Sequence, residues 1–97
     1  MAKGYWIAHV TVKDPEGYKR YQAANAAAFK KYNGRFLVRA GQSETMIGSL
    51  KDRHVIIEFP DYQTALDCYR SPEYQFAIEE RGDAGDVDLV VVEGYDG

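Results

Sequence analysis

Apolar residues alternate with other residues in four short segments, which is the pattern of half-buried β-strands. These strands are predicted at residues 4–12, 35–40, 54–59 and 86–93. In the first strand, Trp6 and Val10 point to one face while Ile7 and His9 point to the other. Within the last strand, residues 87–92 are apolar on both faces apart from Asp88. Both faces of the predicted sheet therefore need cover.

Helical spacing of apolar and aromatic residues fills the segments between the first and second strands and between the third and fourth. A helix is predicted to start at Asp14-Pro15, an N-cap followed by proline, and to end near residue 33. A second helix is predicted after residue 61, and Ser71-Pro72 restarts it as a separate short helix. Residues 41–53 are polar with two glycines. We expect a long hairpin there, with an irregular strand extension at 45–47.

The predicted order is β-α-β-β-α-β, which indicates an α+β ferredoxin-like sandwich with a four-stranded antiparallel sheet. Two helices cover only one face of such a sheet, and we expect them on the face of Trp6 and Val55. The other face keeps Tyr5, Ile7, Leu37 and Ile56. An exposed apolar patch of that extent marks a binding surface. A second copy can cover the patch through a two-fold interface, which gives a barrel-like homodimer. The alternative is a monomer whose open face tolerates its apolar residues.

Length, charge and cysteine content limit the class of protein. The chain has 97 residues, which predicts a single domain, 1–97, with a core of about 3–94. The net charge is -3 with no basic stripe, so neither nucleic acid nor an anionic membrane is expected as a partner. One cysteine forms no internal disulfide, no apolar run is long enough to span a membrane, and the N-terminus lacks a signal-peptide pattern. A cytoplasmic location is therefore expected.

Polar residues among the apolar ones of the second face are the candidates for catalysis. By alternation His9, Arg39, His54 and Glu58 project there. Arg39 and Glu58 lie on neighbouring strands, and their pair either fixes the register of the hairpin or holds a carboxylate or enolate ligand. His9 is a candidate general base, with hydrogen-bonded packing as the alternative. Their spacing indicates no metal site, and no bound cofactor is expected.

Tyrosine is the residue type that stands out, with eight copies in a short chain, and its polar tip suits half-wet cavities and interfaces. Most tyrosines fall on helix stripes and are expected in the core. Tyr69 or Tyr74 can instead line the mouth of a pocket, and Tyr5 is a further candidate for substrate binding. Arg81 ends a helix, where a cation suits the helix dipole, and it can also reach a ligand or a partner chain. Cys68 is expected to be an inert apolar residue.

Several segments, taken in order, resemble a known family. They are Lys3-Gly4-Tyr5-Trp6, Asp14-Pro15 with Tyr18 and Tyr21, Arg35-Phe36-Leu37-Val38-Arg39-Ala40-Gly41, Ile57-Glu58-Phe59-Pro60, Ala65, Tyr69-Arg70-Ser71, Glu73-Tyr74, Arg81 and Val92-Glu93-Gly94. Over residues 3–94 the chain resembles domain-of-unknown-function family 1330, within the dimeric α/β-barrel superfamily. The resemblance implies a ferredoxin-like fold and a barrel-like homodimer but no activity. The family's typical Arg-Gly-Gly after the second strand is Arg39-Ala40-Gly41 here.

The resemblance leaves several functional classes open, because the wider superfamily includes cofactor-free monooxygenases, small isomerases, haem-binding enzymes and stress-response proteins. Our first hypothesis is a cofactor-independent enzyme that performs proton transfer, isomerisation or a monooxygenase-like reaction. It would bind a small apolar or carbonyl-bearing ligand between sheet and helices, with His9, Arg39 and Glu58 as polar contacts. The alternative is a non-catalytic ligand-binding or stress-associated homodimer that uses the same cavity. A third hypothesis is a subunit that only supports assembly through its apolar sheet.

Overall fold

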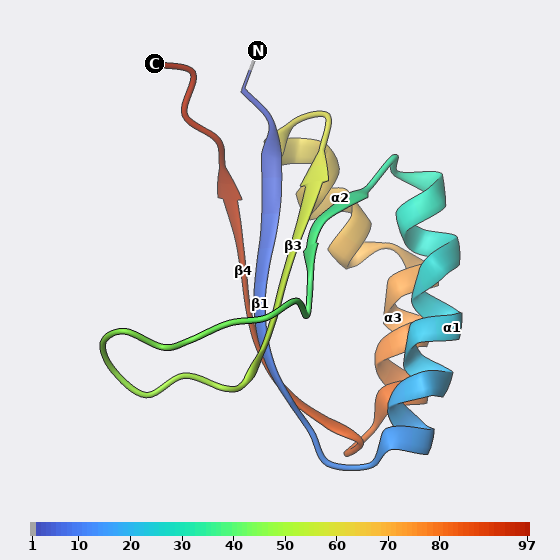
Figure 1. Ribbon diagram of the computed structural model, residues 1–97. Helices are drawn as coiled ribbons and strands as arrows, with labels where there is room; N and C mark the ends of the chain where they lie inside the picture. The colour runs from blue at the N-terminus through green and yellow to red at the C-terminus, as the bar shows by residue number, and fades with distance from the viewer. Residues whose placement is uncertain (1) are drawn as a thin grey trace.

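The computed structural model describes residues 2–97 (Figure 1). Four strands and three helices follow one another in the order β1-α1-β2-β3-α2-α3-β4. They are β1 (Gly4–Val12), α1 (Pro15–Lys31), β2 (Arg35–Arg39), β3 (Arg53–Phe59), α2 (Tyr62–Arg70), α3 (Pro72–Arg81) and β4 (Gly85–Glu93). The expected order, with the second helix broken in two, is confirmed.

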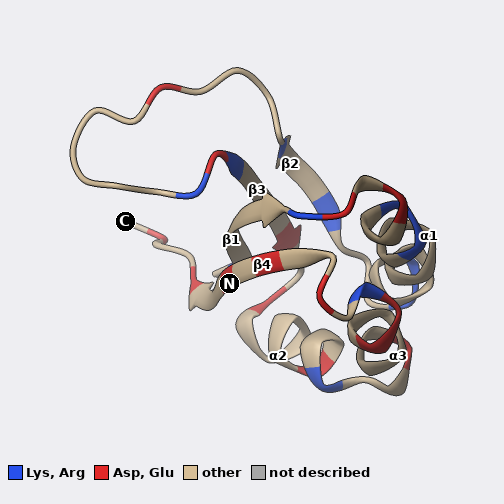
Figure 2. Ribbon diagram, turned by 90° about the horizontal axis from the view of Figure 1, so that it is seen from below, with Lys and Arg blue, Asp and Glu red and all other residues tan. Residues whose placement is uncertain are grey.

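The strands form one antiparallel sheet in the spatial order β2-β3-β1-β4. All three helices cover the same face of this sheet, as Figures 1 and 2 show. The fold is therefore the predicted ferredoxin-like sandwich, and no helix within residues 2–97 covers the second face of the sheet. None of the helices in the described part of the chain is long and apolar enough to cross a membrane.

The core lies between the helices and the covered face, and Trp6 of β1 is at its centre. The ring of Trp6 meets those of Phe29 and Tyr74 edge-on, with centroids 5.2 and 4.8 Å apart. Its indole N–H donates a hydrogen bond of 2.8 Å to the carbonyl of Ala65 in α2, so this buried donor is satisfied. Close approach of α2 also explains Gly4, because a Cβ there would lie 2.4 Å from the Asp61 carbonyl oxygen.

An irregularity in β2 changes which face its last residues occupy. Phe36 lies opposite Ile57, but Val38 rather than Leu37 lies opposite Ile56. Leu37 is thus an extra residue in the ladder, a β-bulge. Because side chains alternate along a strand, one extra residue moves everything after it to the opposite face. Val38 therefore joins the open face, and Arg39 joins the helix-covered face. The prediction that Arg39 projects from the open face is wrong for this reason.

The segment between β2 and β3 is a long loop that projects away from the sheet on the side opposite the helices (Figures 1 and 2). The expected strand extension at 45–47 is wrong, since these residues are irregular and pair with no neighbouring strand. Ala40 starts the loop with a positive φ of 55°, a conformation that costs an L-residue roughly 1–2 kcal/mol and that glycine adopts freely. The strain is held by a 2.8 Å hydrogen bond from the Ala40 N–H to the His54 carbonyl.

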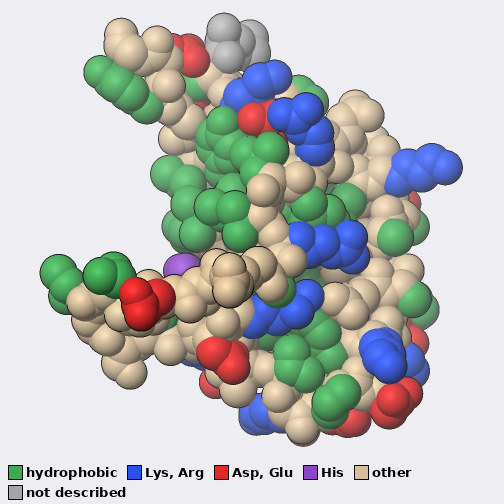
Figure 3. All heavy atoms as spheres, in the orientation of Figure 1, with side chains coloured by type: hydrophobic (Ala, Val, Ile, Leu, Met, Phe, Trp, Pro, Cys, Tyr) green, Lys and Arg blue, Asp and Glu red, His purple; other side chains and the backbone are tan. Residues whose placement is uncertain are grey.

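The open face keeps the apolar character that the alternation predicts. The register places Ile7, Ile56, Val38, Val90 and Val92 on it, and Val90 and Val92 are 53% and 40% exposed. Figure 3 shows hydrophobic side chains gathered above the projecting loop on this side of the molecule. An apolar sheet surface without helical cover is the feature that calls for a partner.

Candidate functional site

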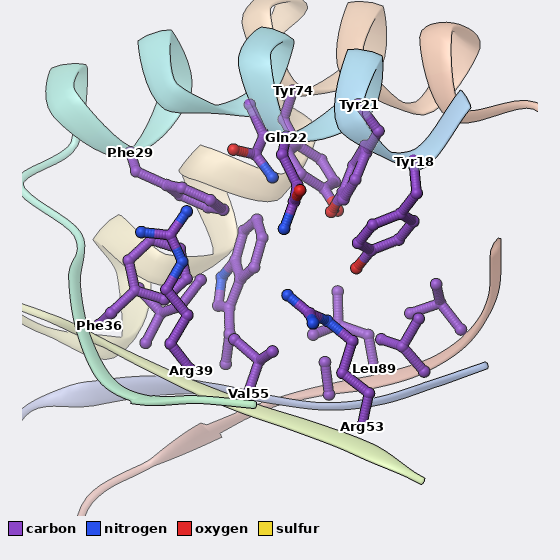
Figure 4. A pocket seen from close by; sticks show the side chains of 16 residues that line it. Tyr18, Tyr21, Gln22, Phe29, Phe36, Arg39, Arg53, Val55, Tyr74 and Leu89 are labelled. Atoms are coloured by element: carbon purple, nitrogen blue, oxygen red, sulfur yellow. The ribbon is translucent and has the colours of Figure 1, made fainter. Parts of the chain in front are cut away.

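A cavity lies between α1, α3 and the covered face of the sheet (Figure 4). Aromatic and aliphatic side chains make most of its wall, together with two amides and two arginines. The lining residues are Trp6, Ala8, Val10, Tyr18, Tyr21, Gln22, Asn25, Phe29, Phe36, Arg39, Arg53, Val55, Ile57, Tyr74, Val87 and Leu89. Its free volume is about 40 Å³, which holds only a few water molecules. A ring-sized ligand needs more room than this, so side chains of the wall have to move to admit one.

Arg39 and Arg53 bring positive charge to this otherwise apolar cavity. Figure 4 shows both side chains extending from the sheet toward the helices. The Arg39 guanidinium carbon lies 4.3 Å from the centre of the Phe36 ring, and that of Arg53 lies 5.4 Å from the centre of the Tyr18 ring. The Nε of Arg53 is buried without a hydrogen-bond partner within residues 2–97. No Asp, Glu or His stands among the described residues that line the cavity.

The local sequence explains how both arginines reach the same space. The bulge at Leu37 turns Arg39 toward the helices. Arg53 begins β3 opposite Val10, in the same alternation as Val55 and Ile57, and so it faces the helices as they do. The two guanidinium groups thus come from the ends of the long loop, on neighbouring strands.

Three tyrosines supply neutral hydrogen-bond donors to the cavity. The hydroxyls of Tyr21 and Tyr74 share a hydrogen bond 2.5 Å long. Burial raises the pKa of Tyr74 far above its ordinary value, the Tyr21 hydroxyl adds to this effect, and Arg81 partly opposes it. Burial likewise raises the pKa of Tyr18, and Arg53 opposes the increase. Tyr18 and Tyr74 are therefore protonated at neutral pH and act as donors rather than as bases.

A second, more open hollow adjoins the first behind Tyr74. It is lined by Tyr69, Tyr74, Arg81, Val87, Leu89 and Val91, and three of these residues line both spaces. The Arg81 guanidinium carbon lies 4.9 Å from the centre of the Tyr21 ring. Its Nε and Nη1 atoms are buried with no hydrogen-bond partner in the described chain. The structure thus brings together three of the predicted ligand contacts, Tyr69, Tyr74 and Arg81.

The polar residues of the open face form two other groups. Glu58 pairs with Arg35 at 3.3 Å and accepts a hydrogen bond of 3.3 Å from the Tyr5 hydroxyl. The predicted Arg39–Glu58 pair is wrong, because the bulge sends Arg39 to the other face while Arg35, before the bulge, lies directly opposite Glu58. The Nδ1 atoms of His9 and His54 are 2.8 Å apart, so one hydrogen bond joins the two rings.

His9, Glu58 and Tyr5 therefore lie on the far side of the sheet from the cavity. The prediction that His9 and Glu58 contact a ligand held between sheet and helices is wrong. Of the three predicted contacts, only Arg39 faces the cavity. The residues that sequence reasoning missed are Arg53, Gln22 and Asn25. Extending the alternation of Val55 and Ile57 back by one more step would have found Arg53. Asn25 lies four residues after Tyr21 on the buried side of α1, and this spacing alone does not distinguish a core position from a cavity wall.

The sheet, its single helical layer and the cavity between them define a ferredoxin-like α+β protein. Within this class, the chain belongs to the family described as domain of unknown function (DUF1330), whose family model matches residues 3–95. No curated protein sequence matches the chain significantly.

Solved structures confirm the fold at low sequence identity. A protein of unknown function from Rhodopseudomonas palustris, RPA0582, is 19% identical with a TM-score of 0.75, covering 99% of this chain and 85% of its own. SnoaB, a cofactor-independent oxygenase from Streptomyces nogalater, is 14% identical with a TM-score of 0.64, covering 100% and 97%. A candidate antibiotic biosynthesis monooxygenase from Nitrosomonas europaea is 13% identical with a TM-score of 0.61, covering 97% and 91%.

Proposed function

We propose that this protein is a small-molecule enzyme that binds an apolar, ring-sized compound with an acidic oxygen in the cavity beneath α1. The oxygen would belong to a carboxylate, an enol or a phenol, and the anion would be stabilised by Arg39 and Arg53. One observation carries this proposal: two arginines face an aromatic cavity in which no described carboxylate neutralises them. An anionic ligand supplies the missing acceptor.

The energetics favour an anion over a neutral guest. A buried guanidinium N–H without an acceptor costs free energy, as Arg53 Nε does here. An oxyanion that accepts from this group removes that cost and gains a charge-assisted hydrogen bond. Tyr18 is a protonated phenol beside Arg53, and it can donate to the same oxygen. Fixed donors around a developing negative charge are the arrangement that lowers the barrier to enolisation.

The chemistry we propose is the loss of a C–H proton to water from an enolisable substrate, with the electron pair delocalised onto the ligand oxygen. Return of a proton from water to another carbon completes an isomerisation. The alternative is a monooxygenase-like reaction in which dioxygen is the oxidant. Dioxygen adds to the anionic carbon, and the resulting hydroperoxide loses water to leave a carbonyl at that carbon. The likeness in fold to SnoaB, described as a cofactor-independent oxygenase, supports that alternative.

A second candidate function is non-catalytic binding of the same class of ligand, including a stress-associated role. It is favoured by the side chains that line the described cavity, since none is a carboxylate or a histidine able to act as a general base. Under this alternative Arg39 and Arg53 only hold the anion. Both functions use one site, so affinity alone does not separate them.

We further propose that the protein is a cytoplasmic homodimer paired through the open faces of two sheets. The fold class and the apolar open face support the dimer. The single, fully buried cysteine suits a reducing compartment.

Binding is tested with 4-nitrophenol, whose anion is followed by its visible absorbance. We expect the wild type to bind the anion and to lower the pKa of the bound phenol. Arg39→Ala and Arg53→Ala should each weaken binding roughly tenfold or more, the usual scale for losing a hydrogen bond to a charged group. Arg35→Ala is the matched control, because Arg35 lies on the same strand but faces away from the cavity. An equal loss in Arg35→Ala, or no binding by the wild type, would contradict the proposal.

Catalysis is separated from binding with phenylpyruvate, which combines an aromatic ring, a carboxylate and an enolisable carbon. Exchange of its C3 protons into D₂O is followed by NMR. An enzyme accelerates this exchange, and Arg53→Ala should abolish the acceleration. Saturable binding without faster exchange would instead establish the non-catalytic alternative.

A further inference from the structure

The loop at residues 40–52, hereafter the arm, lies outside the folded body. Every residue from 41 to 50 is exposed, and Met46 and Ile47 at its tip are 81% and 91% exposed. Gly41 and Gly48 have no atom within 4 Å of where a Cβ would stand. Two large apolar side chains held in water at the end of an extended loop are costly unless another surface covers them.

The exposed surface area of the chain indicates how much surface a partner would cover. A globular monomer of this mass, 11.0 kDa, exposes about 5,600 Å². This chain exposes 6281 Å². The excess, roughly 700 Å², is close to the ~800 Å² that each partner contributes to a standard protein interface.

We infer that the arm is a dimerisation element: the tip of each arm packs against a second copy of this chain. This contact also sets the position of Arg39 and Arg53 in the wall of the cavity. The arm projects on the side of the open sheet face, away from the helices (Figures 1 and 2). One side of the chain thus presents both a long apolar projection and an apolar sheet surface. In a two-fold dimer the arm and the sheet surface of each copy can both be covered by the other copy. An unrelated partner would need two separate surfaces, one complementary to the arm and one to the sheet.

The link to the cavity follows from where the arm is rooted. Arg39 is the residue before the arm and Arg53 is the residue after it. Its base is closed by the hydrogen bond from Ala40 N–H to the His54 carbonyl and by the 2.5 Å pair between Lys51 and Asp88 of β4. A displacement of the arm would therefore act on the backbone next to both arginines. This second half of the inference rests on the proposed function of the cavity.

The first test removes the apolar tip without adding charge. The double variant Met46→Ser/Ile47→Ser should raise the dimer dissociation constant at least tenfold in sedimentation velocity, relative to the wild type. Phe76→Ser is the control, because Phe76 is also apolar and 55% exposed but belongs to α3, in the helical layer away from the open face. An unchanged dissociation constant in the double variant, or an equal rise in Phe76→Ser, would overturn the role of the arm.

The second test needs no destabilised dimer. Ile47→Cys is labelled with a photoactivatable maleimide, and the labelled chain is mixed with ¹⁵N-enriched unlabelled chains. We expect cross-linked peptides that join ¹⁴N and ¹⁵N segments, which only a contact between copies produces. Cross-links confined to one isotope would refute the inference even if the double variant failed to fold.

The coupling is read separately, from binding of 4-nitrophenolate to the double variant. A loss of affinity of at least threefold at concentrations where the variant is monomeric supports the coupling, and unchanged affinity overturns it. If the wild type binds no nitrophenolate while the tip variant still dissociates, the proposed function fails and the dimerisation role of the arm stands.

Discussion

At the scale of single residues, two arginines of β2 place their positive charges on opposite faces of the sheet. Arg35 and Arg39 are four residues apart on one strand, yet Arg35 pairs with Glu58 on the open face and Arg39 lies against Phe36 in the cavity. A regular strand would place both on the same face, since side chains alternate with a period of two. The extra residue Leu37 separates them. A one-residue insertion thus gives the cavity its first positive charge.

Burial makes the thiol of Cys68 unreactive. Its side chain is fully buried, and burial raises the pKa of the thiol to about 12. At pH 8 only about one molecule in ten thousand then carries the reactive thiolate. We predict that a thiol-specific disulfide reagent reacts with native Cys68 at least 100-fold more slowly than with the chain in 6 M guanidinium. The exposed thiol of Ile47→Cys serves as the control; rapid labelling of native Cys68 would contradict the assignment.

At the scale of elements, the three helices start in different ways. Asp14 precedes α1 but makes no side-chain capping bond. Asp61 accepts a 2.7 Å hydrogen bond from the Thr64 N–H at the start of α2, and Ser71 caps α3 by accepting from the Tyr74 N–H. Ser71 therefore ends one helix and begins the next, which is the physical reason for the predicted break between α2 and α3.

The two aspartates make a matched pair for a test of capping. Asp61→Ala should lower the melting temperature by about 5 °C at pH 7, the usual scale for losing a cap in a domain of this size, whereas Asp14→Ala should change it little. The hydrogen bond from the Thr64 N–H holds the pKa of Asp61 below its ordinary value of 3.8. A lowered pKa means that the ionised cap stabilises the fold above about pH 4 and that this gain is lost as the pH falls further.

Melting curves at pH 7 and pH 3 check the sign of this effect. The advantage of wild type over Asp61→Asn should shrink at pH 3, because the asparagine keeps an oxygen acceptor but no charge. An advantage that grows at pH 3 would show that the carboxylate form is not the stabilising one.

At the scale of the whole molecule, the two faces of the sheet differ in what they carry. One face and its helices enclose the core and the cationic cavity. The other presents an apolar surface with a projecting arm. The open face also carries the His9–His54 and Arg35–Glu58–Tyr5 groups, whose polar atoms are largely paired with one another. These contacts lower the cost of burying the groups in an interface.

Light scattering tests whether two copies of the chain pair through the open face. We predict a mass twice the 11.0 kDa of the chain at micromolar concentration. Val90→Asp, which places a charge on the open face where Val90 is 53% exposed, should shift the protein toward the monomer. Phe76→Asp on α3 is the control for an exposed apolar residue outside this face. A monomeric wild type would contradict the dimer.

Local pattern by itself determined the element order, the break between α2 and α3, and the apolar nature of both sheet faces. These features follow from capping residues and from alternation, which act over a few neighbouring residues. Only the tertiary structure decided the bulge at Leu37, because strand register is set by pairing with β3 and not by β2 alone. That register moved Arg39 into the cavity beside Arg53, and left His9 and Glu58 on the opposite face.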